Sequence, residues 1–230
     1  MRIAVACFVK TLGVSPVKTR LAEGIGRSAA DEVYKTCVEL IRQSLSKAAS
    51  ENSQDVYLIP HWAVAEQSEI SATVWSDFPV VYQGEQGLGH RLKRVYENLS
   101  QKFDGVVLIG ADCPLLSPDK IKAAAQKVAM SDNHILGPTD DGGYYLFGSR
   151  FPVDAQNDNP SVWLNVPYSA PDTSEKFIGA LSLKRPVSRL ETLFDLDTKS
   201  DLERLLRLAT KDVSPWEKDV LIAMRARLKL

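Results

Sequence analysis

The chain has 230 residues, with 28 Lys and Arg against 29 Asp and Glu, so its net charge is close to zero. This balance excludes a global attraction to nucleic acid or to a membrane surface, and any bound anion must be held by a local cluster of cations. A hydrophobic fraction of 44% and a charged fraction of 25% are typical of a globular protein with a sizeable core.

Apolar runs typical of buried strands alternate along the chain with amphipathic helical segments. We expect strands over residues 2–8, 55–60, 79–83, 105–110, 134–138, 144–148 and 182–187. We expect helices over residues 29–48, 88–102, 118–130, 173–181 and 214–229, with one more starting after Thr198 or Ser200. This alternation predicts an α/β fold with a mainly parallel sheet. Ligands of such sheets bind beyond the carboxyl ends of the strands, so the residues after each strand are the candidates.

The cysteines and the N-terminal segment indicate in which cellular compartment the protein is expected. Cys7, Cys37 and Cys113 are odd in number and widely spaced, which favours reduced thiols over a disulfide framework. The apolar run from Ile3 to Val9 is too short for a signal sequence or a membrane span. We therefore expect a cytoplasmic protein without membrane or nucleic-acid partners.

A cluster of cations follows the first expected strand. Lys10, Lys18 and Arg20 lie within eleven residues, around Ser15 and Pro16, in a stretch that we expect to form an irregular loop. A guanidinium, flexible ammonium groups and free backbone N–H groups together can form a phosphate-binding nest. The alternative is a solvated basic turn.

An acid, Asp112, follows the strand expected at 105–110. A carboxylate is poorly tolerated beside an apolar layer unless it meets a cation, and Mg²⁺ needs only one or two protein carboxylates. Asp195 and Asp197, in FDLDTKSDL, are candidates for the second ligand. The alternatives are local capping of N–H groups by Asp112 and helix capping by Asp197 or Thr198.

Two glycine-rich stretches also follow expected strands. Asp140 and Asp141 precede Gly142 and Gly143, and the two glycines would let a ligand approach the backbone closely. A hairpin turn with an Asp-Gly pair is the alternative. The other stretch, GEQGLGHRL over 84–92, enters a helix whose positive N-terminus suits a nucleotide.

Taken in order, these stretches resemble the GT-A nucleotide-diphospho-sugar transferase superfamily. Within it they are most similar to the radical-SAM/selenodomain-associated transferases, a glycosyltransferase-like family. The matching segments are FVKTLGVSPVKTRL, GLGHRL, GADCP, GPTDDGGYYLFG and FDLDTKSDL. The resemblance implies one Rossmann-like, three-layer αβα GT-A domain over residues 1–210, followed by a peripheral helix over 211–230.

The resemblance also implies a role for each matching position. The residues that bind the substrates would be Lys10, Lys18, Arg20, Gly87, Gly89, Arg91, Asp140, Gly142 and Gly143. The carboxylates that hold Mg²⁺ or Mn²⁺ would be Asp112 with Asp195 or Asp197. The residues at the reacting groups would be Asp112, Asp141 and Lys18. This chain departs from the family pattern at Ser15 and Pro16, which replace a glycine, and Pro16 offers no N–H to a phosphate.

These features together predict an enzyme that uses a nucleotide-activated substrate. The leading hypothesis is glycosyl transfer from a nucleotide-diphospho-sugar to a small acceptor, with Asp141 or Asp140 as the general base. The first alternative is nucleotidyl transfer from an NTP, with release of pyrophosphate. The second is a nucleotide-binding protein that has lost turnover.

Overall fold

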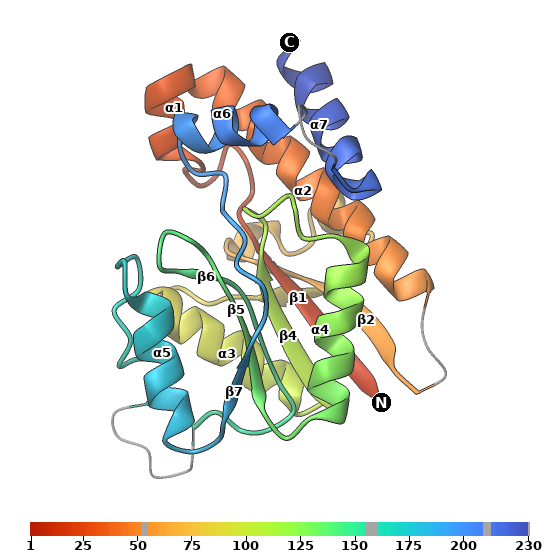
Figure 1. The fold of residues 1–230 in the computed structure, drawn as a ribbon, viewed down its shortest axis with the longest axis vertical. Helices are drawn as coiled ribbons and strands as arrows, with labels where there is room; N and C mark the ends of the chain where they lie inside the picture. The colour runs from red at the N-terminus through yellow and green to blue at the C-terminus, as the bar shows by residue number, and fades with distance from the viewer. Residues whose placement is uncertain (52–54, 155–160, 209–212, 230) are drawn as a thin grey trace.

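The computed structural model describes residues 1–51, 55–154, 161–208 and 213–229, and a central sheet runs through the molecule (Figure 1). The sheet has seven strands in the order β3-β2-β1-β4-β6-β5-β7. Their bounds are β1 (Arg2–Val9), β2 (Tyr57–Val64), β3 (Val80–Tyr82), β4 (Gly105–Gly110), β5 (His134–Pro138), β6 (Tyr144–Ser149) and β7 (Val187–Arg189). Only β6 runs antiparallel to its neighbours β4 and β5. The predicted α/β domain with a mainly parallel sheet is confirmed.

Helices cover both faces of this sheet. Their bounds are α1 (Thr19–Ile25), α2 (Arg27–Ser50), α3 (Leu88–Ser100), α4 (Pro118–Met130), α5 (Thr173–Ser182), α6 (Lys199–Arg207) and α7 (Pro215–Leu228), with short 3-10 turns η1 (Gln67–Glu69) and η2 (Thr73–Trp75). Helices α2 and α4 pack on one face and α3 and α5 on the other, so the layers are αβα.

The alternation of β1 side chains divides the core between the two faces. Ile3, Val5 and Cys7 point toward α2 and α4, whereas Ala4 and Ala6 point toward α3, and all five are fully buried. Side chains alternate along a strand, so an uninterrupted apolar run is buried on both faces. This is why RIAVACFV forms a strand in the interior of the sheet.

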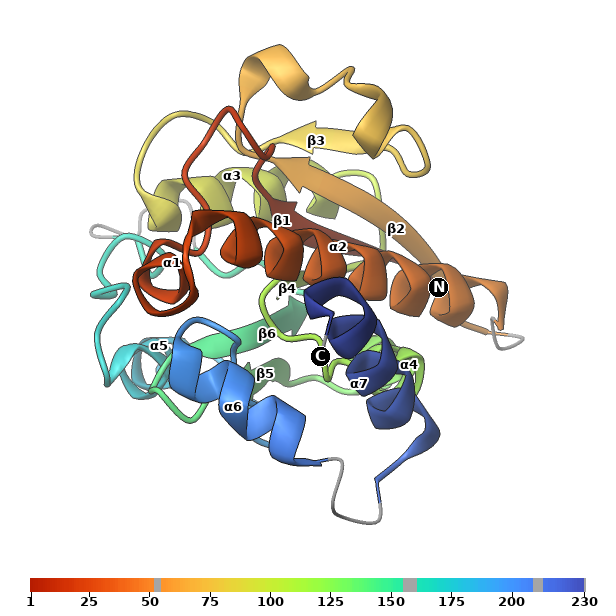
Figure 2. The ribbon, with the colours of Figure 1, turned by 90° about the horizontal axis from the view of Figure 1, so that it is seen from above.

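A third apolar cluster lies beyond the carboxyl edge of the sheet. Leu21 of α1, Leu205 of α6 and Met224 of α7 are fully buried there, together with Val33 and Cys37 of α2. Figures 1 and 2 show α1, α6 and α7 gathered around α2. This cluster fixes α1 and α6 beside the strand ends. The predicted boundary between residues 210 and 211 lies outside the described residues.

The helix starts follow local rules. Ser117 caps α4 through its hydroxyl and Pro118 occupies the first turn. Thr198 caps α6 in a reciprocal capping box with Asp201, which confirms one of the two expected caps. The capping box orders the chain directly after Asp197.

Two local predictions are wrong. The stretch after Pro16 is not wholly a loop, because α1 begins at Thr19. The strand expected at 182–187 is shorter and lies further along the chain, since α5 continues to Ser182 and β7 spans only Val187–Arg189. Pro186 has no N–H to donate, so only its carbonyl joins the sheet, accepting from the His134 amide.

The three cysteines agree with the expectation from the sequence. Cys7, Cys37 and Cys113 are all buried and free, as predicted. Among the described residues, every helix is too short or too polar to cross a membrane.

Candidate active site

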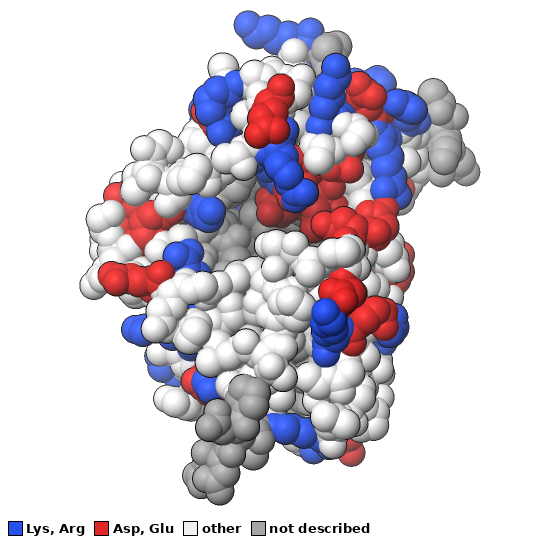
Figure 3. Space-filling view, turned by 90° about the vertical axis from the view of Figure 1, so that its left-hand side faces the viewer, with Lys and Arg blue, Asp and Glu red and all other residues white. Residues whose placement is uncertain are grey.

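The carboxyl edge of the sheet gathers the acids and cations that the sequence singles out. The chain from Leu193 to Asp197 crosses this edge, with the Leu196 amide donating to the Asp112 carbonyl at 2.9 Å and the Asp140 amide donating to the Leu193 carbonyl at 3.1 Å. Figure 3 shows acidic and basic side chains side by side above a hollow in this face of the molecule. Segments far apart in sequence therefore meet at one site.

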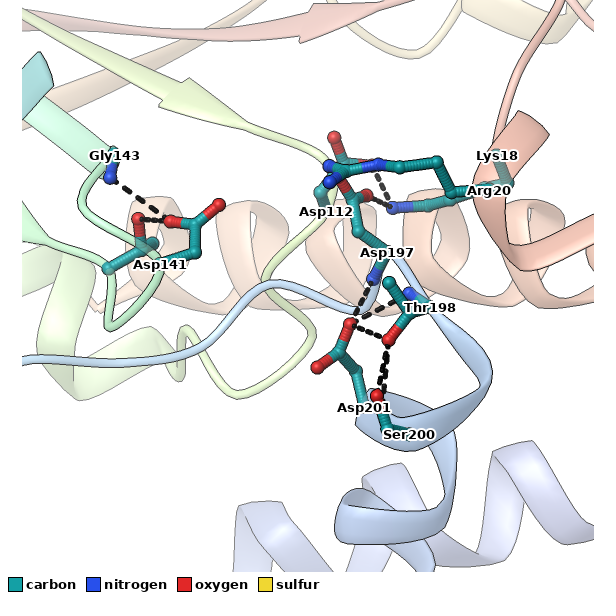
Figure 4. A network of polar contacts seen from close by, with 10 residues as sticks. Lys18, Arg20, Asp112, Asp141, Gly143, Asp197, Thr198, Ser200 and Asp201 are labelled. Atoms are coloured by element: carbon teal, nitrogen blue, oxygen red, sulfur yellow. Dashed lines mark hydrogen bonds and ion pairs between the residues drawn. The ribbon is translucent and has the colours of Figure 1, made fainter. Parts of the chain in front are cut away.

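Lys18 links two of these acids. Its Nζ lies 2.5 Å from Oδ1 of Asp112 and 2.9 Å from Oδ1 of Asp197 (Figure 4). The Lys18 side chain is only 2% exposed, whereas that of Asp112 is 47% exposed. The ammonium is thus enclosed, and Asp112 remains open to a ligand.

The backbone of Lys18 is strained. Its φ of 46° lies in the left-handed region, which costs a non-glycine residue on the order of 1 kcal/mol. The residue stands at the N-cap of α1 and its carbonyl accepts from the Ala22 amide. The start of α1 and the two ion pairs together hold this conformation.

Arg20 completes the network from the first turn of α1. Its Nη2 lies 2.6 Å from Oδ2 of Asp197, so both oxygens of Asp197 face cations. The Arg20 side chain is 64% exposed and can reach a ligand in solution. Lys10 is also exposed, and its Nζ donates to the Pro16 carbonyl at 3.3 Å.

The pKa values of the side chains in this network reflect an excess of acidic over basic groups. Burial opposes the charged form of Lys18, yet Asp112 and Asp197 raise its pKa above the ordinary value. Burial would raise the pKa of Asp197, but the charges of Lys18 and Arg20 hold it below its usual range. Burial and the charges of Asp112 and Asp197 raise the pKa of Asp195 to about 8. The surplus of negative charge among these side chains would favour the binding of a further cation.

The donor set fits a hard divalent cation. Asp112 and Asp197 aim one oxygen each at the same nitrogen, so a small positive charge already bridges them. Mg²⁺ is usually held by one or two carboxylates, with phosphates and water as its other ligands. In the described ranges no three His, Cys, Asp or Glu side chains form a complete metal cage. The residues therefore suit a cation whose other ligands are water and phosphate oxygens.

The predicted nest of free N–H groups is wrong for four residues of the loop after β1. The amides of Lys10, Thr11, Val14 and Ser15 all donate to acceptors of the chain itself, at 2.9 to 3.1 Å. An anion at this loop would depend on the side chains of Lys10, Lys18 and Arg20 rather than on these backbone groups.

The turn after β5 orients Asp141. Its Oδ1 accepts from the Thr139 hydroxyl at 2.6 Å and from the Gly143 amide at 3.0 Å (Figure 4). Asp140 instead forms an ion pair with Arg204 of α6. Asp141 is therefore fixed through one oxygen and Asp140 is engaged by a cation.

The glycines of this turn and of α3 pack against the chain itself. A Cβ at Gly142, whose φ is 91°, would lie 1.8 Å from the Pro171 carbonyl oxygen. A Cβ at Gly89 would lie 2.4 Å from the Trp163 carbonyl oxygen, while Gly87 has open space beside it. Residues 161–171 of the chain itself, rather than a ligand, therefore lie close to the backbone of Gly142 and Gly89.

Arg91 lies apart from the Lys18 network. Its Nε donates to the Gln86 carbonyl at 2.7 Å and its Nη1 to Oε1 of Gln83 at 3.4 Å, so it holds the loop before α3. Arg91 also lines a cavity of about 790 Å³ between that loop and α3, bordered by Tyr82 and Arg94. None of the residues that line this cavity belongs to the Lys18 network.

The sequence interpretation missed two polar residues that support the strand ends. Gln83 is buried, and its Nε2 donates to the carbonyls of Val9 at 3.1 Å and Ala63 at 2.7 Å. Glu66 accepts from the Thr11 amide at 2.9 Å and thereby holds the basic loop. The signal was available at Gln83, since a polar side chain ends the apolar run PVVYQ.

Comparison with protein families gives one match. A family model described as "Uncharacterized protein conserved in bacteria (DUF2064)" matches residues 44–170, which is more than half of the chain. The match includes Asp112 and Asp141 but ends before Asp197. No curated protein sequence matches the chain.

Solved structures resemble the chain over nearly its whole length. One, named a "putative nucleotide-diphospho-sugar transferase" from Desulfovibrio desulfuricans G20, has a TM-score of 0.80 and 23% identity, covering 99% of this chain and 96% of its own. The 4-diphosphocytidyl-2C-methyl-D-erythritol synthase from Anaerococcus prevotii has a TM-score of 0.56 and 11% identity, covering 91% and 96%. A nucleotidyl transferase from Methanothermobacter has a TM-score of 0.52 and 14% identity, covering 91% and 99%. At these identities the likeness shows the shared fold.

Proposed function

The chain belongs to the bacterial protein family DUF2064, and we propose that it is a nucleotide-using transferase. The observation that carries the proposal is the network in which Lys18 and Arg20 meet Asp112 and Asp197 at the carboxyl edge of the sheet. One site therefore contains both the cations that could bind phosphates and the carboxylates that could bind a divalent cation. Open α/β sheets bind their ligands at this edge.

Glycosyl transfer from a nucleotide-diphospho-sugar to a small acceptor is the reaction that we favour. The support is the likeness of the fold, over 99% of the chain, to the structure named a "putative nucleotide-diphospho-sugar transferase". The ordered motifs of the sequence agree with that name. The finer assignment to the radical-SAM/selenodomain-associated transferases is part of the same proposal.

The departing nucleotide would be stabilised by charge. Asp112 and Asp197 would hold Mg²⁺ or Mn²⁺, which supplies positive charge to the diphosphate oxygens. Arg20 and Lys10 are exposed and would contact the same oxygens. Such contacts accelerate the reaction because negative charge on the leaving group grows in the transition state.

Asp141 would act as the general base. Its Oδ1 is fixed by Thr139 and Gly143, which leaves Oδ2 to take the proton of the acceptor hydroxyl. Asp140 is the weaker candidate because Arg204 engages its carboxylate. A base that is oriented before the acceptor arrives needs no rearrangement during the reaction.

Nucleotidyl transfer is the second candidate. It is favoured by the likeness of the fold to the Anaerococcus synthase and to the Methanothermobacter nucleotidyl transferase. In this reaction a phosphorylated substrate attacks the α-phosphate of an NTP and pyrophosphate leaves. The same cations would stabilise the departing pyrophosphate.

The two reactions are separated by their products. The protein is incubated with Mg²⁺ and radiolabelled nucleotide sugars, and separately with radiolabelled NTPs and sugar phosphates. Release or transfer of the sugar supports glycosyl transfer, whereas pyrophosphate release with an NDP-linked product supports nucleotidyl transfer. Nucleotide binding without either product supports a protein that has lost turnover, and the absence of both binding and turnover contradicts the proposal.

The base assignment is tested with a matched pair of variants. Asp141→Asn should lower the turnover about 100-fold or more while the affinity for the nucleotide stays unchanged. Asp132→Asn, at an exposed ion pair with Arg150, is the control and should retain turnover within a few-fold. Equal losses in both variants would contradict the role of Asp141.

A further inference from the structure

The ammonium of Lys18 lies where a metal ligand set would place its cation. It touches one oxygen of Asp112 at 2.5 Å and one oxygen of Asp197 at 2.9 Å. The same two carboxylates are the ones that would hold the divalent cation in the proposed function, on which the inference below depends. Lys18 and that cation therefore have the same partners.

Lys18 and a divalent cation cannot share these oxygens in the observed geometry. A cation on Asp112 and Asp197 would lie against the ammonium, and two positive charges in an enclosed site repel strongly. The Lys18 side chain is 2% exposed, so little solvent screens this repulsion. A divalent cation that takes these two oxygens therefore displaces Lys18.

A released Lys18 ammonium could bind a phosphate group of the nucleotide. Lys18 is the N-cap of α1, and Arg20, in the first turn of the same helix, reaches Asp197. Both side chains would then face the phosphate groups that accompany the divalent cation. A long, flexible lysine can change partners with little movement of the backbone.

We propose that Lys18 is an exchangeable cation of the nucleotide site. In the ligand-free protein it neutralises Asp112 and Asp197. It gives up these carboxylates to the divalent cation and moves to the nucleotide phosphate. The divalent cation and the nucleotide consequently raise each other's affinity, and this coupling is reciprocal.

The chain offers a matched control outside the site. Lys122 of α4 also bridges two carboxylates, with its Nζ 2.5 Å from Oε2 of Glu51 and 2.9 Å from Oδ1 of Asp119. These distances equal those around Lys18. Replacing either lysine with methionine removes a charge of the same kind and keeps a similar shape.

The first test measures Mn²⁺ binding to the full chain without nucleotide, from the electron paramagnetic resonance signal of free Mn²⁺. Lys18→Met should bind Mn²⁺ about tenfold tighter than the wild type, because the competing ammonium is gone. Lys122→Met should match the wild type, and Asp112→Asn should bind at least about tenfold more weakly. Unchanged or weaker binding by Lys18→Met overturns the exchange.

The second test uses the wild-type chain, so it remains decisive if Lys18→Met does not fold. Lysines are acetylated with a water-soluble reagent and quantified by mass spectrometry, with and without saturating Mg²⁺. Lys18 should become about fivefold or more reactive with Mg²⁺ as its ammonium is released, and Lys122 should not change. A Lys18 that stays protected overturns the proposal.

The outcomes separate this inference from the proposed function. Mn²⁺ binding that depends on Asp112, with no gain in Lys18→Met, contradicts the exchange alone. Absence of Mn²⁺ binding in every variant contradicts the cation site of the proposed function, and the exchange fails with it.

Discussion

The side chains of Lys18 and Asp197 lie 2.9 Å apart although 179 residues separate them along the chain. This ion pair ties the segment after the first strand to the segment before α6. Arg20 adds a second contact to the same carboxylate. The site is therefore assembled by tertiary packing, in which Leu21 of α1 and Leu205 of α6 share one buried cluster.

Arg20 should be required for nucleotide affinity rather than for stability. Its side chain is 64% exposed, and exposed ion pairs contribute at most about 1 kcal/mol to folding. A charged hydrogen bond to phosphate contributes about 1.5–3 kcal/mol, so Arg20→Met should weaken nucleotide binding about tenfold or more. Isothermal titration calorimetry in Mg²⁺ measures this loss. Arg27→Met, at an exposed ion pair on α2, is the control and should bind like the wild type.

Gly142 should tolerate no side chain. Its φ of 91° is unfavourable for other residues, and a Cβ would lie 1.8 Å from the Pro171 carbonyl oxygen. We expect Gly142→Ala to lower the free energy of unfolding by at least about 2 kcal/mol, as measured with urea.

Gly179 supplies the control for that variant. It lies within α5 and a Cβ there would meet no atom within 4 Å. Gly179→Ala should stabilise the protein by about 0.5–1 kcal/mol, since alanine favours the helix. A Gly142→Ala variant as stable as the wild type would contradict the described packing of residue 171 on the turn.

The stability should depend on pH through His134. Burial, with smaller effects of Arg185 and Lys184, lowers the pKa of His134 to about 4. Its Nδ1 lies 2.8 Å from the hydroxyl oxygen of Ser149. Below about pH 6.5 the unfolded chain takes up a proton that the folded chain does not, so the free energy of unfolding falls between pH 6.5 and 4.

A glutamine in place of His134 isolates this contribution. His134→Gln keeps a polar group near Ser149 and cannot titrate, so it should remove as much as about 3 kcal/mol of the fall between pH 6.5 and 4. Urea unfolding across this range provides the measurement. A profile that is the same in His134→Gln and the wild type would contradict the buried neutral histidine.

The sheet and the position of the candidate site at its carboxyl edge are predictable from the sequence for a local reason. Apolar runs such as GVVLIG indicate strands that are buried on both faces of a sheet. Parallel strands end at the same edge of the sheet, so the residues that follow them lie close together. Asp112 is an example, since it lies two residues after the end of β4. The ion pair between Asp112 and Lys18 is not predicted by the sequence, although both residues are candidates, because an ion pair depends on side-chain positions that only packing determines.

Long-range contacts also explain the local errors. Helix α1 is too short to be stable alone and depends on the burial of Leu21, which no local pattern reports. The predicted strand ends at Pro60, because proline usually interrupts a strand, whereas β2 continues to Val64. The structure tolerates this proline because β3 pairs only with Trp62–Val64, so one side of β2 has no strand beside Pro60.

The cation dependence of nucleotide binding tests the central claim most directly. Thermal unfolding is followed with UDP-, GDP-, CDP- and ADP-sugars and the matching NTPs, each with and without Mg²⁺, for the wild type, Asp112→Asn and Asp119→Asn. Asp119 is the control because its side chain is 87% exposed on α4. At least one nucleotide should raise the Tm by about 5 °C or more at 100-fold excess over its Kd, only with Mg²⁺. Asp119→Asn should keep this response and Asp112→Asn should lose it. No response to any nucleotide, or an equal response in Asp112→Asn, would contradict a cation-assisted nucleotide site at Asp112.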